Sequence, residues 1–96
     1  MEQFTVKELE PIIGELVQVC DLKQQKLTEL KLTHVEETKL SSKQWDSFCV
    51  TLQGSAEMTL EQGTYKLSHP AFGDVDLFLC PNNATEYEII VNRKLD

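Results

Sequence analysis

The sequence has no long apolar run, no clustered glycines and only two histidines. A helix needs roughly 20 apolar residues to cross a bilayer, and no stretch approaches that length. The N-terminus also lacks the basic and apolar regions of a secretory signal. Four scattered glycines form neither a phosphate-binding loop nor a dinucleotide fingerprint. We therefore expect a cytoplasmic domain that binds neither membranes nor nucleotide cofactors, with export as part of an assembly left open.

Basic side chains are scarce as well. Nine Lys and Arg stand against sixteen Asp and Glu, which gives a formal net charge of −7. Such a charge repels phosphate backbones and anionic lipid surfaces, so nucleic acids and membrane surfaces are not expected as partners. The acidity fits two interpretations, which are plain solubility and attraction to a basic protein.

Cysteine occurs three times, as Cys20, Cys49 and Cys80. An odd number excludes complete internal pairing, and no two cysteines are close enough for a CxxC motif. All three lie in apolar or alternating runs, where a free cysteine behaves as a small hydrophobic residue. These observations favour a reducing compartment.

The 96 residues, 41% of them hydrophobic, are typical of one globular domain spanning 1–96. The stretch FTVKELEPIIG predicts a short N-terminal helix over 5–13. Thr5 and Glu8 have the spacing of a capping box. Pro11 stops a straight helix and begins a second turn, and Gly14 suits the left-handed stop. The residues expected to form an apolar face over a sheet or a barrel end are Leu9, Ile12 and Ile13.

From about residue 15 to 93 the apolar period changes to two, which predicts strands. In the second of these strands Val35 is out of phase with Leu30 and Leu32, so a one-residue bulge is expected near Thr33 or His34. The predicted strands cover 15–20, 26–38, 47–54, 64–69, 74–80 and 86–93.

Turn signals separate most of these segments. In HPAFG, Pro70 presets φ for a β-turn and Gly73 supplies a positive φ, which predicts a short hairpin loop. The polar stretch at 38–46 has no period and is expected to be a loop, with Trp45 folding over an apolar edge. The pattern predicts a mainly β fold, a small antiparallel six-stranded barrel or a compact sandwich.

Candidate chemistry is sparse. His69 could act as a base with Asp74 or Asp76 across the turn, but no nucleophile motif accompanies it. We interpret His69 as a strand-end residue that hydrogen-bonds the turn backbone. His34, the cysteines and the two aspartates lack the spacing of a metal site. No catalytic, cofactor or metal residues are therefore assigned. The surface candidates are His69, Asp74, Asp76 and Trp45.

Four stretches resemble, in order, a family of small bacterial domains of about a hundred residues that is known only as a domain of unknown function. They are FTVKELEPIIGELVQV, FCVTLQG, QGTYKLSHPAFGDVDLFLCP and YEIIVNR. The region 21–46 is not matched. The most specific motif comprises Gln62, Gly63, Thr64, Tyr65, His69, Pro70, Gly73, Phe78 and Pro81.

The resemblance implies a small β-rich domain with no catalytic residues to carry over. Some members are encoded beside phage-tail-like or tail-collar proteins, which implies an accessory role in such an assembly. In similar sequences the position of Cys80 is more often aliphatic, which implies that Cys80 packs in the core.

Three functions remain open. The first is a non-enzymatic domain that binds a protein partner, such as a tail-fibre-like protein. The second is an acidic inhibitor or immunity-type protein that masks a basic toxin or enzyme. The third is a small hydrolase or ligand-binding barrel that uses His69, Asp74, Asp76 and Tyr65. A homodimer is also possible, through an edge strand at 15–20 or 86–93.

Overall fold

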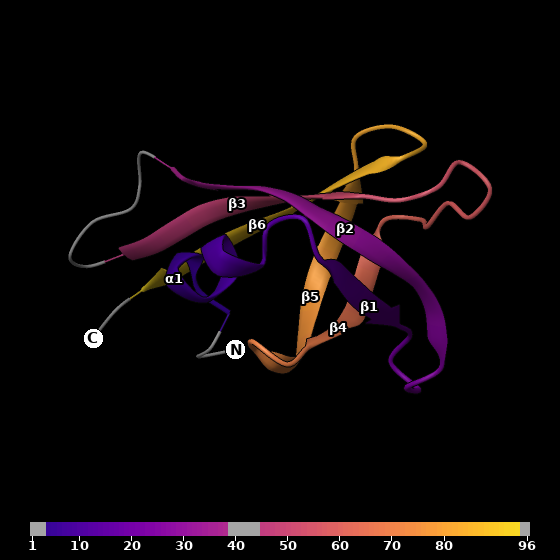
Figure 1. Ribbon diagram of the computed structural model, residues 1–96, viewed down its shortest axis with the longest axis horizontal. Helices are drawn as coiled ribbons and strands as arrows, with labels where there is room; N and C mark the ends of the chain where they lie inside the picture. Colours follow the sequence, from indigo (N-terminus) through magenta and orange to yellow (C-terminus); the bar gives the residue numbers. More distant parts are fainter. Residues whose placement is uncertain (1–3, 39–44, 95–96) are drawn as a thin grey trace.

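The computed structural model describes residues 4–38 and 45–94, with only the backbone of residues 45, 46, 93 and 94. Six antiparallel strands form a closed barrel in the order β1-β2-β3-β6-β5-β4, with one short helical segment at the N-terminus (Figure 1). The elements are α1 (Val6–Leu9), the 3-10 turn η1 (Glu10–Ile12), β1 (Leu16–Cys20), β2 (Lys26–Glu37), β3 (Trp45–Gln53), β4 (Gly63–His69), β5 (Gly73–Pro81) and β6 (Glu86–Lys94).

The predicted mainly β fold with a short N-terminal helix is confirmed, and the sheet closes as a barrel. Closure contradicts the expected edge strands at 15–20 and 86–93, because β1 lies between β2 and β4 and β6 lies between β3 and β5. Closing a sheet removes the exposed backbone edges that invite association. Most of the predicted loop at 38–46, and the side chain of Trp45, lie outside the described residues. Neither described helical segment has the length and hydropathy to traverse a bilayer.

The interior of the barrel is filled by the apolar side chains that alternate along each strand, as the pattern predicts. Two hydrogen bonds between residues far apart in the chain satisfy polar groups in and near the core. The Leu60 N–H donates to the Tyr87 hydroxyl at 2.8 Å, and the Ser47 hydroxyl donates to Asn92 Oδ1. The buried apolar residues of the strands are Val17, Val19, Cys20, Leu30, Leu32, Phe48, Val50, Leu52, Leu67, Val75, Leu77, Leu79, Tyr87, Ile89 and Val91.

The N-terminal segment forms as its sequence predicts, with one difference. The Glu8 N–H donates to Thr5 Oγ1 at 3.2 Å, and Gly14 has φ of +100°. Leu9 and Ile12 are buried, but Ile13 is 44% exposed. The expectation that Ile13 shares their apolar face is wrong, because Ile13 has already left the helical conformation, with ψ of 129°.

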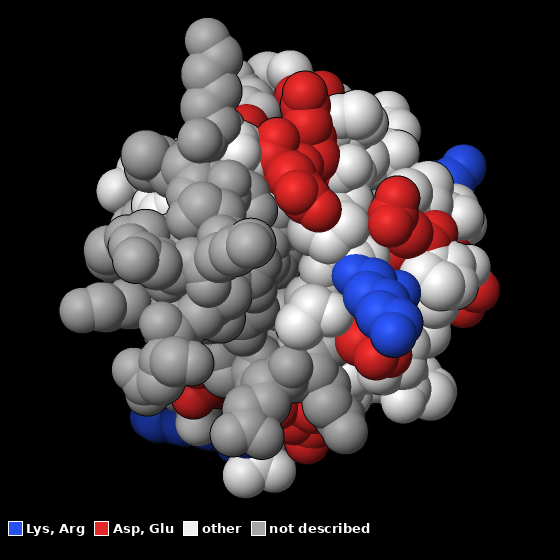
Figure 2. Space-filling view, turned by 90° about the vertical axis from the view of Figure 1, so that its left-hand side faces the viewer, with Lys and Arg blue, Asp and Glu red and all other residues white. Residues whose placement is uncertain are grey.

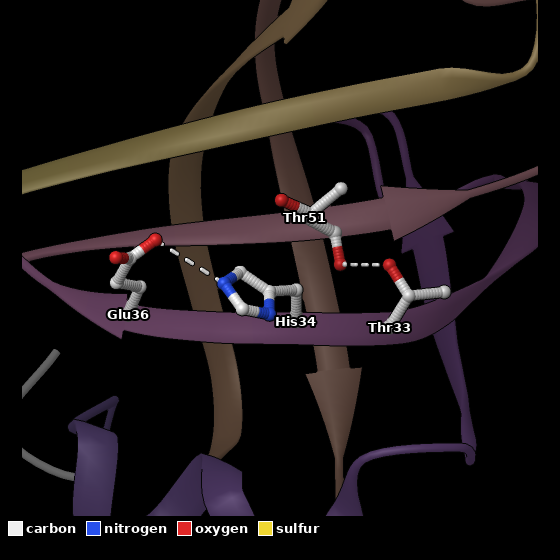
Figure 3. A network of polar contacts seen from close by, with 4 residues as sticks. All are labelled: Thr33, His34, Glu36 and Thr51. Atoms are coloured by element: carbon white, nitrogen blue, oxygen red, sulfur yellow. Dashed lines mark hydrogen bonds and ion pairs between the residues drawn. The ribbon is translucent and has the colours of Figure 1, made fainter.

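The predicted bulge in β2 lies at Thr33. Leu32 pairs with Leu52 and His34 pairs with Thr51, so Thr33 has no partner of its own on β3. The Thr33 hydroxyl donates to the Thr51 carbonyl at 3.1 Å (Figure 3). The extra residue brings Val35 back to the inner side, where it packs against the core.

The β4–β5 hairpin places an aromatic side chain inside the barrel end. The Phe72 N–H donates to the His69 carbonyl at 3.1 Å, and Gly73 has φ of +76°, as expected for this turn. Phe72 is 4% exposed and meets Phe4 edge to face, with ring centroids 5.1 Å apart. Phe4 also lies 6.0 Å from the Phe48 ring. The N-terminal segment and the hairpin turn therefore share one aromatic cluster.

The ladders that close the barrel differ in length. Nine residue pairs join β3 to β6, whereas three join β1 to β4 and two join β5 to β6. The β4–β5 hairpin is thus attached to its neighbours by short ladders on both sides. Figure 1 shows β5 and β6 crossing steeply and diverging below their paired ends.

The aromatic cluster leads to a stability prediction. Phe72→Ala should lower the free energy of unfolding by about 3–5 kcal/mol, since it removes a buried ring and leaves a cavity. Phe78→Ala is the matched control, because Phe78 is 50% exposed on the same strand pair. Its effect should stay within about 0.5 kcal/mol. Urea denaturation of both variants checks this, and equal effects would contradict the described packing.

Candidate functional site

An open depression of about 460 Å³ lies on the outer surface where β1 and β4 separate. The β1–β4 ladder ends at the pair Gln18 and Ser68, and beyond it the two strands are no longer joined by paired residues. Side chains from β1, β2 and the β4–β5 hairpin surround the opening. The lining residues are Leu16, Gln18, Glu29, Ser68, His69, Pro70, Gly73 and Asp74.

His69 forms one wall of the depression and bridges the two separating strands. The Ala71 N–H donates to His69 Nδ1 at 3.0 Å, so Nδ1 must carry a lone pair. In a neutral ring the proton is then on Nε2, which donates to Glu15 Oε1 at 3.0 Å. The imidazole also stacks on Phe72 with centroids 5.9 Å apart, and its side chain is only 10% exposed. Both ring nitrogens are therefore engaged in holding the turn.

Two carboxylates, those of Glu29 and Asp74, are among the other lining residues. Asp74 Oδ1 accepts a hydrogen bond from the Ser68 hydroxyl at 2.7 Å, which fixes the carboxylate beside the opening. Glu29 of β2 lies opposite Gln18 of β1. Glu29 Oε1 also lies 3.6 Å from Lys26 Nζ, and both of these side chains are half-exposed. Among the described residues that line the depression, none is Lys or Arg. The site can therefore accept a positively charged group, and exposed Leu16 and Pro70 can contact its apolar part.

The structure brings together two of the surface residues that the sequence singles out, His69 and Asp74. Asp76 is two residues further along β5, opposite Lys66 and outside the depression. The Tyr65 hydroxyl donates to the Glu61 carbonyl at 2.7 Å. The four residues of the hydrolase hypothesis thus do not converge on one point.

Sequence reasoning missed Glu15 and Glu29. Glu15 is 54 positions from His69 in the chain, and no local pattern connects them. The alternation of the second strand places Glu29 on the outer face, which was a usable signal. Within residues 4–38 and 45–94, no three His, Cys, Asp or Glu side chains lie together in a way that could hold a metal ion.

The outer face of β2, β3 and β6 carries a second set of polar and apolar side chains. His34 Nε2 lies 3.2 Å from Glu36 Oε2 along β2 (Figure 3). Glu36 pairs with Cys49, and Cys49 pairs with Ile90. Burial raises the pKa of the Cys49 thiol, and the charges of Glu88 and Glu36 raise it further.

All three cysteines are free thiols. Cys20 is buried, in line with its expected role as a small core residue. Cys49 and Cys80 are half-buried, and Cys80 lies on the outer face opposite Glu88. The core-packing role implied for Cys80 is therefore wrong, because the period of β5 directs Val75, Leu77 and Leu79 inward.

Comparison with known protein families shows to which family the chain belongs. The sequence model of a domain of unknown function, DUF6916, matches residues 4–91. The chain belongs to the DUF6916 family. The match includes residues 21–46 of this DUF6916 domain, which the resemblance alone did not cover. No curated protein and no solved structure matches the chain.

The hydrogen bonds of His69 predict how substitutions should rank. His69→Ala should lower the free energy of unfolding by about 1–3 kcal/mol, because the Ala71 N–H loses its acceptor. His69→Asn should cost less, since an Asn oxygen can accept from the N–H two residues on. Glu15→Gln should change stability by less than about 0.5 kcal/mol, because Glu15 is 56% exposed and Gln still accepts from Nε2–H. Urea denaturation measures these differences. An equal loss of unfolding free energy in His69→Asn and His69→Ala would contradict the hydrogen bond from the Ala71 N–H.

The raised pKa of the Cys49 thiol predicts slow alkylation. Because the thiolate is the reactive form, iodoacetamide at pH 8.5 should modify Cys49 more slowly than free cysteine. Glu88→Gln should accelerate the reaction by removing one of the charges that raise this pKa. The contribution of Cys49 to stability is complete below the ordinary thiol pKa and is lost as pH rises through the raised value. Peptide mass spectrometry follows the rate, and an unchanged rate in Glu88→Gln would contradict this electrostatic effect.

Proposed function

We propose that this DUF6916 domain is a non-enzymatic protein-interaction module that receives a basic side chain of its partner in the depression between β1 and β4. One observation carries the proposal, which is the presence of two carboxylates, Glu29 and Asp74, in an open depression that no described Lys or Arg lines. A guanidinium or ammonium group would meet Glu29 and Asp74, while its methylene stem would contact Leu16 and Pro70.

The geometry of His69 supports a binding role over acid–base catalysis. A general base needs a ring nitrogen that is free to take a proton from a substrate. Nδ1 already accepts from the Ala71 N–H, and Nε2 already faces Glu15. In this arrangement His69 gives the rim a fixed shape, and a preformed rim lowers the entropic cost of binding.

The proposal extends to an accessory place in a phage-tail-like or other bacterial assembly, which the family resemblance implies. The partner in that case would be a structural protein with an exposed Arg or Lys. Co-expression with a tail-like protein encoded beside the domain, followed by size-exclusion chromatography, tests this extension. Independent elution of the two proteins at micromolar concentration would count against it.

An acidic inhibitor of a basic toxin or enzyme is the second candidate, and the net charge of −7 favours it. Figure 2 shows acidic side chains covering more of the described surface on one face than basic side chains do. Such a field accelerates association with a basic partner and makes the rate fall with salt. For an isolated partner, an association rate that does not change between low and high salt would remove this candidate.

A short peptide tests the depression directly. In NMR titrations of the ¹⁵N-labelled full chain, the peptide acetyl-Gly-Arg-Gly-amide should shift the amide resonances of Gln18, Ser68 and Asp74. The double variant Glu29→Gln, Asp74→Asn should weaken binding about tenfold, because two charge-assisted hydrogen bonds are lost.

The matched control is the same peptide with citrulline in place of arginine, which has nearly the same shape and no charge. Citrulline should produce much smaller shifts. Equal shifts with both peptides, or shifts confined to other strands, would show that the depression is not a site for basic side chains.

A further inference from the structure

A separate part of the outer surface carries apolar side chains on three neighbouring strands. We call Cys49 of β3, Ile90 of β6 and Phe78 of β5 the outer patch. Ile90 is 57% exposed and Phe78 is 50% exposed, while Cys49 is half-buried. Single exposed apolar residues are common on protein surfaces, but adjacent ones often mark a contact site.

The strand register directs these three side chains outward from the barrel. Cys49 and Ile90 are direct cross-strand partners. Phe78 and Ile90 are each two residues from the pair formed by Cys80 and Glu88, so all of them point outward. The β5–β6 ladder ends at the pair Cys80 and Glu88, so no backbone pairing joins Phe78 to Ile90.

Carboxylates surround the outer patch. Glu36 is opposite Cys49, Glu88 is opposite Cys80, and Asp76 is two residues before Phe78 on the same face of β5. Lys66, opposite Asp76, is the basic side chain beside them on the neighbouring strand. Glu88 and Glu36 also raise the pKa of the Cys49 thiol, in line with their position beside the β3 end of the patch.

This charge pattern decides which occupant fits. A second copy of the chain, related by a two-fold axis, would bring each acidic rim against its own copy, and like charges in a partly desolvated contact are unfavourable. A segment with apolar side chains flanked by Lys or Arg would instead bury Phe78 and Ile90 and pair with the rim.

We infer that the outer patch docks a protein segment in which apolar side chains are flanked by basic ones. The inference rests on the protein-interaction function proposed above, and it adds a second surface on strands other than those that form most of the depression.

A pair of peptides tests the inference. In NMR titrations of the ¹⁵N-labelled full chain, acetyl-KKVFVKK-amide should shift the amide resonances of Cys49, Phe78 and Ile90. Acetyl-EEVFVEE-amide, which has the same apolar centre and the opposite charge, should not. Ile90→Thr should weaken binding of the lysine peptide about fivefold, because one apolar contact is lost. Leu22→Thr is the matched control, since Leu22 is 58% exposed in a turn away from the patch, and it should leave binding unchanged.

Three results would overturn the inference. The first is equal binding of both peptides, and the second is an unchanged affinity in Ile90→Thr. The third is a concentration-dependent shift of the patch resonances without peptide, which would identify a second copy as the occupant. The variant Glu29→Gln, Asp74→Asn separates the two proposals, because it should weaken the arginine peptide and leave the shifts that the lysine peptide causes at Cys49, Phe78 and Ile90 unchanged.

Discussion

The barrel depends on a short backbone ladder in which Gln18, Val19 and Cys20 of β1 pair with residues 66–68 of β4. Without it, six strands in so small a domain would form a curled sheet with two open edges. Beyond the end of this ladder β1 and β4 separate, and side-chain hydrogen bonds replace backbone pairing between them. The contact of Glu15 with His69 and the bond from Ala71 hold the separated ends in place. The depression is therefore a direct consequence of how the barrel closes.

Local patterns in the sequence were enough to place the strands. Alternation located six strands, and the phase change between Leu32 and Val35 predicted a bulge near Thr33 or His34, which the structure places at Thr33. The same reasoning could not place Phe72, which a turn motif describes only through Pro70 and Gly73. Its burial depends on Phe4, far away in the chain. The prediction that Ile13 is buried was wrong for a related reason, because it extended the helical period one residue past the end of the helix.

The candidate site was predictable only in part. His69 and Asp74 are close in sequence across a recognisable turn, so their proximity follows from the hairpin. Glu15 lies just before β1 and Glu29 lies in β2, and their positions follow from the closure and register of the barrel. A single sequence with alternating residues is compatible with both a barrel and a sandwich. The partners of an outward side chain differ between these two folds.

The two proposed surfaces are connected through one strand. The outward residues of β5 include, in order, Asp74 in the depression, Asp76 between the surfaces, and Phe78 in the outer patch. A partner that lies along β5 would meet a carboxylate at one end and an aromatic ring at the other. Such a layout gives a bound chain a preferred direction, because its basic and apolar groups must follow in a fixed order.

The aromatic cluster also has a consequence for how the chain matures. Phe4 is synthesised well before its ring partners Phe48 and Phe72, which follow it in the chain. Contacts between distant parts of a chain slow folding, because loop-closure entropy is lost before the contacts form. The Phe4 side chain therefore lacks its core contacts until most of the domain has been synthesised. A nascent chain stalled before the β4–β5 hairpin would expose that side chain to chaperones and to aggregation.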